Sequence, residues 1–331
     1  MARTEAAVFV DVGRAAFEGV EVSDPGPGQV QVRTRFSTIS AGTEGWILHD
    51  RFTWNPTSYP CVPGYQRVGT VEALGPGVSG WSVADRVMAT RSDWPGSPAA
   101  RSGAHAAVGN TLASELFALP GEVGDVDASG LVVAQVGYNA ASRARIEPGD
   151  PVVVYGDGLI GQCAAQAARA RGARVILVGH RAERLELAVA HSADAVVNGH
   201  GGEVVEAVRR AAGAEHVTAV LDSVQREEAQ RQYTPLLARA EGQIVYCGFT
   251  PGTVWADMAL LQQRELTAHF VSGWTRPRME ATLDLMARGL ITLEPLVTHL
   301  VPASRAPEMY RMIAAKAEPF LGITLDWGRT G

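Results

Sequence analysis

The chain has 331 residues, of which 46% are hydrophobic and 19% charged, so it is long and apolar enough for two globular domains, each with its own core. Its formal net charge of -6 and the lack of any dense Lys/Arg run argue against nucleic acid and anionic lipid as partners. The first residues lack the apolar stretch of a signal peptide, and no later segment is long enough to span a membrane. We therefore expect a cytoplasmic protein.

Residues 1 to about 125 form short apolar stretches separated by Gly and Pro, a pattern typical of short strands and tight turns. Within them, 29–35 alternates strictly between polar and apolar residues, and 68–74 leads into a Gly-Pro-Gly turn. These features predict a twisted, barrel-like antiparallel sheet. The three cysteines, Cys61, Cys163 and Cys247, are odd in number and far apart, which indicates reduced thiols.

From residue 151 onward, apolar runs alternate with segments rich in Ala, Arg and Glu, which is the pattern of βαβ units and a parallel sheet. The predicted strands are 151–155, 174–178, 218–222 and 243–247. The predicted helices are 159–171, 181–191, 202–212, 226–239, 278–288 and 304–315. A last strand at 322–327 is expected to return to the first domain.

A glycine-rich turn follows the first of these strands directly. The segment Gly156-Asp157-Gly158-Leu159-Ile160-Gly161 stands between the apolar run 152–155 and a strong helix former. In this context Gly156 permits the tight turn, Gly158 admits a pyrophosphate close to the backbone, and Gly161 lets the helix pack on the sheet. We predict a dinucleotide site here; the alternative is a tight turn that binds no ligand.

The end of the second strand governs the choice of cofactor, because an acid there accepts a hydrogen bond from the ribose 2′-OH. This chain has Gly179-His180-Arg181 at that position, where Gly179 leaves room and Arg181 offers a fork for a 2′-phosphate. We therefore predict NADP(H) rather than NAD(H). The alternative is that Arg181 and Arg184 only solvate the start of a helix.

The order of these features resembles the medium-chain dehydrogenase/reductase superfamily, the alcohol dehydrogenase-like group, over essentially the whole chain. The resemblance implies an α/β protein with a GroES-like twisted β-barrel domain at 1–125, a Rossmann doubly wound domain at 126–294, and a return of 295–331 to the first domain. It also implies a homodimer. Gly42-Thr43-Glu44 and the ending Leu325-Asp326-Trp327 are most similar to the branch that contains bacteriochlorophyllide dehydrogenases.

The resemblance also assigns cofactor contacts to the ends of the later strands of the second domain. These contacts are Ser223 after the third predicted strand, Cys247, Gly248 and Phe249 at the fourth, and Val271 beyond it. Their expected location agrees with the rule that ligands bind beyond the carboxyl ends of parallel strands.

The residues that bind zinc in zinc alcohol dehydrogenases of this superfamily are replaced here. Ala41 and Tyr65 stand at two ligand positions, and no cysteine occurs from residue 62 to 162. Neither Ala nor Tyr supplies the usual zinc ligands, so we predict a zinc-free enzyme. Cys61 precedes Tyr65 by four residues, and we interpret it as a packing residue.

Without a Lewis acid, carbonyl chemistry needs hydrogen-bond donors and a proton source. Thr43 matches the proton-relay hydroxyl of the superfamily, and Tyr65 stands where a zinc-binding His would be. Alternatively, Thr43 is a turn residue that bonds to its own backbone, and Tyr65 is a ring that fills the space left by the lost metal. Glu44 and Gln66 match supporting carboxylates that orient Thr43 or a water, although Glu44 could equally be an ion-pair partner. We interpret His49, Asp50 and His105 as surface residues.

Aromatic residues are concentrated in segments that the resemblance places around the substrate, which favours a bulky or planar substrate. Those assigned to substrate are Trp46, Trp54, Tyr65, Trp94, Tyr138 and Trp274. Individually, each could instead be a core or dimer-contact residue. The predicted function is NADP(H)-dependent hydride transfer at a C=O/CH–OH group. Reduction of an activated C=C bond and a non-catalytic NADPH-binding role are the alternatives.

Overall fold

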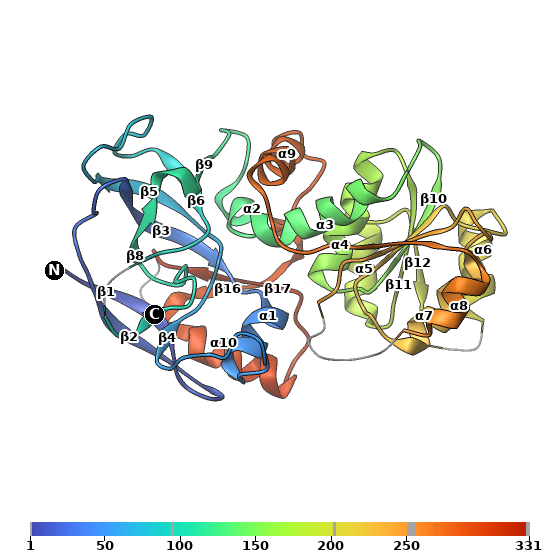
Figure 1. Ribbon diagram of the computed structural model, residues 1–331, viewed down its shortest axis with the longest axis horizontal. Coiled ribbons are helices and arrows are strands. Elements are labelled where there is room, and N and C mark those ends of the chain that lie inside the picture. The colour runs from blue at the N-terminus through green and yellow to red at the C-terminus, as the bar shows by residue number, and fades with distance from the viewer. Residues whose placement is uncertain (1, 94–95, 201–202, 250–255, 329–331) are drawn as a thin grey trace. The chain divides into compact units, whose positions relative to one another are not determined.

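The computed structural model describes residues 2–93, 96–200, 203–249 and 256–328, and it divides into two compact units (Figure 1). Unit 1 comprises residues 1–132 and 297–331, and unit 2 comprises residues 133–296. Unit 1 extends past residue 125 because helix α2 (Asp125–Ser129) packs against two strands of that unit. No helix among the described residues has the length and apolar character needed to cross a lipid bilayer.

Unit 1 is built mainly of β-strands, as its Gly- and Pro-punctuated sequence predicts. One sheet has the order β2-β1-β4-β7, and the other β16-β17-β3-β5-β6-β9 with β8 paired to β3. The strands are β1 (Ala2–Asp11), β2 (Arg14–Val22), β3 (Gln29–Thr38), β4 (Cys61–Val62), β5 (Arg67–Leu74), β6 (Arg86–Ala89), β7 (Ala99–Ala100), β8 (Val108–Leu112), β9 (Leu116–Ala118), β16 (Val297–Pro302) and β17 (Gly322–Asp326). The alternation along β3 buries Val30 and Val32 in a core with Val71 and Val87.

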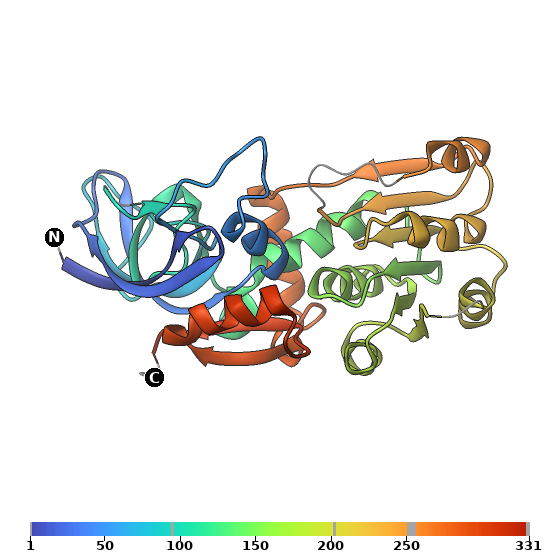
Figure 2. The same ribbon diagram turned by 90° about the horizontal axis from the view of Figure 1, so that it is seen from below.

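The C-terminal segment belongs to unit 1. Strand β17 pairs antiparallel with β3, which aligns Thr324 with Thr38, and β16 runs parallel to β17. Helix α10 (Ala306–Ala315) packs against β2 and against helix α1 (Ala41–Leu48). Figure 2 shows this red segment beside the blue N-terminal strands. The return therefore brings residues near both ends of the chain into one core.

Unit 2 contains a six-stranded parallel sheet in the doubly wound order β12-β11-β10-β13-β14-β15. The strands are β10 (Pro151–Tyr155), β11 (Arg174–Gly179), β12 (Ala195–Asn198), β13 (Ala219–Asp222), β14 (Gln243–Tyr246) and β15 (Thr267–Phe270). The central strands are continuous apolar runs because helices cover both of their faces. The two short strands β12 and β15 were not predicted.

The helices of unit 2 agree with the predicted ranges where those ranges carry a clear helical pattern. The helices are α3 (Leu131–Arg143), α4 (Leu159–Ala170), α5 (Ala182–His191), α6 (Val204–Ala212), α7 (Glu227–Tyr233), α8 (Met258–Gln263) and α9 (Arg276–Ala287). Of these, α3 and α8 were not predicted. The predicted helix 226–239 is shorter, because a 3-10 turn at Thr234–Leu236 contains Pro235, which has no N–H to donate. The start of the range 202–212 lies outside the described residues.

Candidate functional site

The glycine turn connects β10 to α4 in unit 2, and two of its glycines are required by the local geometry. Gly156 has φ +116, and a Cβ added to it would lie 2.2 Å from the Ser223 hydroxyl oxygen. A Cβ on Gly161 would lie 2.0 Å from the Gly156 carbonyl oxygen. Both positions therefore exclude a side chain for reasons of folding alone.

Gly158 differs, because a Cβ there would meet only the Arg184 Nη1, at 3.9 Å. It is the residue before α4, whose first described helical bond runs from the Gln162 N–H to the Gly158 carbonyl. The amides of Leu159, Ile160 and Gly161 precede that bond, at the positive end of a 12-residue helix. This arrangement fits a pyrophosphate approaching the turn over Gly158.

This difference predicts opposite outcomes for two alanine variants. We expect Gly161→Ala to lower the free energy of unfolding by about 2 kcal/mol, because the new methyl overpacks the turn. Gly158→Ala should change stability far less but weaken dinucleotide binding about tenfold by filling the approach to the backbone. Thermal melts and calorimetric titration with NADPH measure the two effects. Unchanged binding by Gly158→Ala would contradict the placement of the pyrophosphate.

The residues after β11 surround a carboxylate that the sequence prediction did not include. Asp157, from the glycine turn, is 3% exposed, and its Oδ1 accepts hydrogen bonds from Arg181 Nη1 at 3.1 Å and Arg184 Nη1 at 3.3 Å. Gly179 is buried at the end of the strand, and Arg181 is 44% exposed. The predicted 2′-phosphate residues thus lie together, with an acid among them.

The remaining predicted cofactor residues follow the neighbouring strands of the sheet. The Ser223 hydroxyl donates to the Tyr155 carbonyl at 2.8 Å, and the Cys247 and Gly248 amides donate to the Asp222 carbonyl at 2.9 and 3.1 Å. Phe249 is 46% exposed, whereas Val271 is buried just after β15. Four parallel strands therefore end at one edge, where the turn also lies.

In unit 1, the structure brings the predicted Thr43, Tyr65 and Glu44 together. Thr43 lies in the first turn of α1, and the Tyr65 hydroxyl is hydrogen-bonded to the side chains of Thr43 and Ser40. Burial, followed by the nearby Glu44 carboxylate, raises the pKa of Tyr65 to about 12. The phenol therefore remains protonated at neutral pH and can act as a hydrogen-bond donor.

Glu44 belongs to a fully buried polar network. Its Oε2 accepts hydrogen bonds from His105 Nε2 at 3.0 Å and from the Tyr310 hydroxyl at 2.5 Å, and its Oε1 accepts one from the Ser40 amide at 2.9 Å. Glu44 and His105 are both 0% exposed. The carboxylate is thus held in place by groups from the residue before α1, from α10 and from the loop before β8.

The surface interpretation of His105 is therefore wrong. Its Nδ1 lies 2.8 Å from the Ser37 hydroxyl, which accepts a hydrogen bond from Trp327 Nε1, also at 2.8 Å. Because the indole can only donate, Ser37 can direct its own proton to Nδ1, which leaves Nε2–H to donate to Glu44. The apolar neighbours Ala104 and Ala106 were the sequence signal for burial.

Two further predicted residues have mainly structural contacts. The buried Gln66 amide donates to the Thr38 carbonyl at 3.1 Å and its Oε1 accepts from the Val132 amide at 3.1 Å. Cys61 packs in the core of unit 1, and burial raises the pKa of its thiol to about 11. All three cysteines are buried and free.

The aromatic residues assigned to substrate are distributed over both units. Trp46 packs edge-on against Phe52 with ring centroids 5.8 Å apart, and Phe52 lies 5.3 Å from Trp54, which is 59% exposed. In unit 2, Tyr138 lies on α3 and Trp274 is 41% exposed. Trp94 lies outside the described residues. Unit 1 thus presents an aromatic group that continues from α1 to a solvent-exposed indole.

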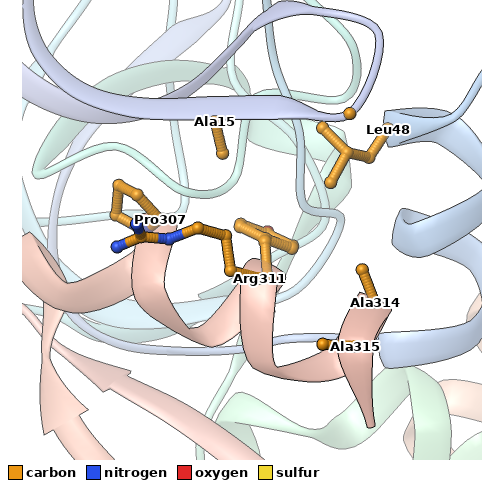
Figure 3. Close-up of a pocket in the computed structure, with 8 residues that line it drawn as sticks. Ala15, Leu48, Pro307, Arg311, Ala314 and Ala315 are labelled. Carbon is orange, nitrogen blue, oxygen red and sulfur yellow. The ribbon is translucent and has the colours of Figure 1, made fainter. Parts of the chain in front are cut away.

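A hollow of about 300 Å³ lies beside α10 (Figure 3). Its lining comes from the β1–β2 turn, the start of β2, the end of α1 and one face of α10: Gly13, Ala15, Leu48, Pro307, Tyr310, Arg311, Ala314 and Ala315. None of these is a predicted site residue, although Tyr310 also donates to Glu44 and so connects the hollow to the buried polar network. Across residues 2–93, 96–200, 203–249 and 256–328, no group of three or more His, Cys, Asp or Glu is arranged to hold a metal ion.

Two family matches cover most of the chain. Residues 26–125 match the alcohol dehydrogenase GroES-like domain, and residues 160–288 match the zinc-binding dehydrogenase family. An alcohol dehydrogenase of Cupriavidus necator is 27% identical, covering 98% of this chain and 99% of the relative. The 2-desacetyl-2-hydroxyethyl bacteriochlorophyllide A dehydrogenase of Rhodobacter capsulatus is 26% identical, covering 92% of each.

Solved structures with the same fold include complexes with both nicotinamide cofactors. A zinc-binding dehydrogenase of Sinorhizobium meliloti 1021 bound to NADP superposes with a TM-score of 0.83 at 22% identity, covering 98% of this chain and 100% of that one. An alcohol dehydrogenase of Escherichia coli CFT073 complexed with NADH gives 0.84 at 20% identity, covering 99% and 100%.

Proposed function

The chain belongs to the medium-chain dehydrogenase/reductase superfamily of oxidoreductases, and we propose that it is a zinc-independent, NADP(H)-dependent member acting on a C=O/CH–OH group of a bulky metabolite. The observation that carries the proposal is the Tyr65 phenol, hydrogen-bonded to Thr43 and Ser40 and kept protonated beside Glu44. This group offers a proton and a hydrogen bond where zinc-dependent relatives use a metal.

The chemistry of the donor set supports zinc independence. Zinc sites use thiolate, imidazole and carboxylate ligands at close range. Here Glu44 and His105 bond to each other and to Ser40, Tyr310 and Ser37, so their donor atoms are already committed to the buried network. Ala41 and the protonated phenol of Tyr65 supply none of the three ligand types.

The bound nicotinamide would supply or accept the hydride, and the chain's own residues would manage the proton. In reduction, Tyr65 donates a hydrogen bond to the substrate oxygen and then transfers its proton as negative charge develops there. An alkoxide is a stronger base than the phenolate of a phenol with a pKa of about 12, so this transfer is favourable. Thr43 and Ser40 stabilise the phenolate by hydrogen bonds, and the Glu44 charge favours its reprotonation.

NADP(H) is proposed as the cofactor because Arg181 and Arg184 present two positive charges after β11. We expect wild-type protein to bind NADPH more tightly than NADH. Arg181→Ala should weaken NADPH binding about tenfold and affect NADH binding much less, because NADH has no 2′-phosphate for the lost guanidinium to attract. Calorimetric titration measures both constants, and tighter binding of NADH by the wild type would overturn the assignment.

A substrate panel tests the reaction class. Purified protein with NADPH is offered bulky aldehydes, ketones and α,β-unsaturated ketones, before and after dialysis against a zinc chelator. Carbonyl reduction that survives chelation is the expected result. Turnover of the enones alone would establish C=C reduction instead, and NADPH binding without turnover of any substrate would favour a non-catalytic role. The exposed Trp54 is the main reason for choosing bulky substrates.

We also propose a homodimer and a cytoplasmic location. The edge strand β15 carries Phe270, which is 74% exposed, and an exposed edge strand with an aromatic residue is suited to pairing with a second copy. Three free cysteines are consistent with a reducing compartment. Sedimentation velocity tests the dimer, and cell fractionation tests the location.

A further inference from the structure

The side chain of Asp157 connects the glycine turn to the end of β11. Its Oδ2 accepts hydrogen bonds from the backbone amides of His180 and Arg181, at 2.9 and 3.0 Å, while its Oδ1 faces the guanidinium groups of Arg181 and Arg184. Burial by itself would raise the pKa of this carboxyl, but the two amides and the two arginines outweigh burial and lower it. Asp157 is therefore ionised at neutral pH.

This carboxylate occupies the space that a side chain at the end of β11 would fill. A Cβ added to Gly179 would lie 2.5 Å from the Asp157 Cβ and 2.8 Å from its Oδ2. An acid at the end of the second strand of this fold binds the ribose 2′-OH in NAD-dependent enzymes. The chain thus places a carboxylate beside that strand end from a different segment, and Gly179 is the residue that makes room for it.

The charges around Asp157 act in opposite directions on a 2′-phosphate. Arg181 and Arg184 attract the phosphate, whereas Asp157 repels it. Asp157 also accepts a hydrogen bond from the Nη1 atom of each arginine. The sum of these three charges is +1. His180, whose pKa is lowered by burial, adds no full charge at neutral pH, and its ring lies 4.9 Å from that of His200. A 2′-hydroxyl, in contrast, carries no charge for Asp157 to repel, and it could donate to Oδ1 in place of one arginine N–H.

We propose that Asp157 is a specificity-determining residue for the adenosine end of the cofactor: it accepts the ribose 2′-OH of NAD(H) and restrains the preference for NADP(H) that Arg181 and Arg184 create. The proposal rests on the nicotinamide-dependent function proposed above. It implies that the wild-type protein uses both cofactors, with a selectivity smaller than two arginines alone would produce.

The test is the ratio of the NADH and NADPH dissociation constants, measured by calorimetry on the full chain. In Asp157→Asn the amide oxygen can still accept the two backbone hydrogen bonds, but the charge is lost. We expect NADPH to bind more tightly and NADH more weakly, so that the ratio Kd(NADH)/Kd(NADPH) rises about tenfold. Asp157→Ser keeps a hydroxyl oxygen as a hydrogen-bond acceptor and should shift the ratio in the same direction. This variant replaces Asp157→Asn in the test if the Asn variant folds poorly.

Asp194→Asn is the matched control. Asp194 also accepts a β11 backbone amide, that of Val175 at 2.7 Å, and pairs with Arg169 at 3.2 Å, but it lies at the other end of the strand. The same loss of charge there should leave the ratio unchanged.

The alternative roles of Asp157 give different results. A lower ratio in Asp157→Asn, with only NADPH binding weakened, would show that the carboxylate serves to orient the arginines. Equal weakening of both cofactors would show a purely structural role, and either result overturns the proposal. Failure of the wild type to bind any dinucleotide would refute the proposed function itself, and a wild type that prefers NADH would refute only the NADP(H) assignment.

Discussion

The Tyr65→Phe variant is expected to reduce carbonyl substrates with a kcat about 100-fold below that of the wild type, while the dissociation constant of NADPH stays the same. The phenylalanine ring preserves packing but removes the hydroxyl that bonds to Thr43 and Ser40. Stopped-flow measurement of NADPH oxidation at saturating substrate separates this loss from an effect on binding. A kcat within threefold of wild type would refute the role of Tyr65 as proton donor.

The pH profile gives a second measure of the same residue. Because the pKa of Tyr65 is raised to about 12, the phenol keeps its proton from pH 6 to pH 10. The wild-type rate of reduction should therefore show no decline from ionisation of this phenol in that range, and should fall only as the pH approaches 12. Tyr59→Phe is the control, because the Tyr59 hydroxyl donates to the carbonyls of Ile47 and Leu48 and should affect folding rather than kcat.

Removal of the Glu44 side chain should have the largest effect on stability. Glu44→Ala leaves the buried His105 Nε2 and the Tyr310 hydroxyl without their acceptor, and we expect the free energy of unfolding of unit 1 to fall by about 3 kcal/mol. Urea titration followed by tryptophan fluorescence measures this change. The signal reports mainly on unit 1, whose sequence contains Trp46, Trp54, Trp81, Trp94 and Trp327.

Two comparison variants show whether the loss of stability in Glu44→Ala comes from the buried network. Glu308→Ala removes a carboxylate of the same unit that pairs with Arg305 at the surface, and it should leave the urea midpoint almost unchanged. Glu44→Gln retains an oxygen that accepts from the Ser40 amide, so its free energy of unfolding should lie between those of the wild type and Glu44→Ala. If Glu44→Ala were as stable as Glu308→Ala, the buried network would contribute nothing to folding.

The parts of the fold that could be predicted from the sequence are those encoded by local patterns. The apolar runs at 151–155 and 174–178 are confirmed as parallel strands, because a strand covered on both faces needs an uninterrupted apolar sequence. Strand β12 was missed because Ala195–Asn198 is too short to show a periodicity, and it is a strand only because β11 pairs with it. Helix α1 was missed for a similar reason, since two glycines among its eight residues weaken the local signal.

The glycine turn and the replacement of the zinc ligands by Ala41 and Tyr65 could be inferred from the order of residues alone, because they are properties of short segments in known contexts. The residues that surround those segments in space could not be inferred from the order of residues. His105, Tyr310 and Trp327 reach Glu44 and Ser37 from 61, 266 and 290 residues away along the chain.

Asp157 shows the same limit within a single motif. The sequence places it next to Gly156, but only the close packing of the turn against the end of β11 directs its carboxylate to the amides of His180 and Arg181. A sequence determines by itself what is local: strand and helix periodicity, a turn that needs glycine, the chemical types of its side chains. Tertiary structure decides which charges meet, because electrostatic and hydrogen-bond energies depend on distance in space rather than along the chain.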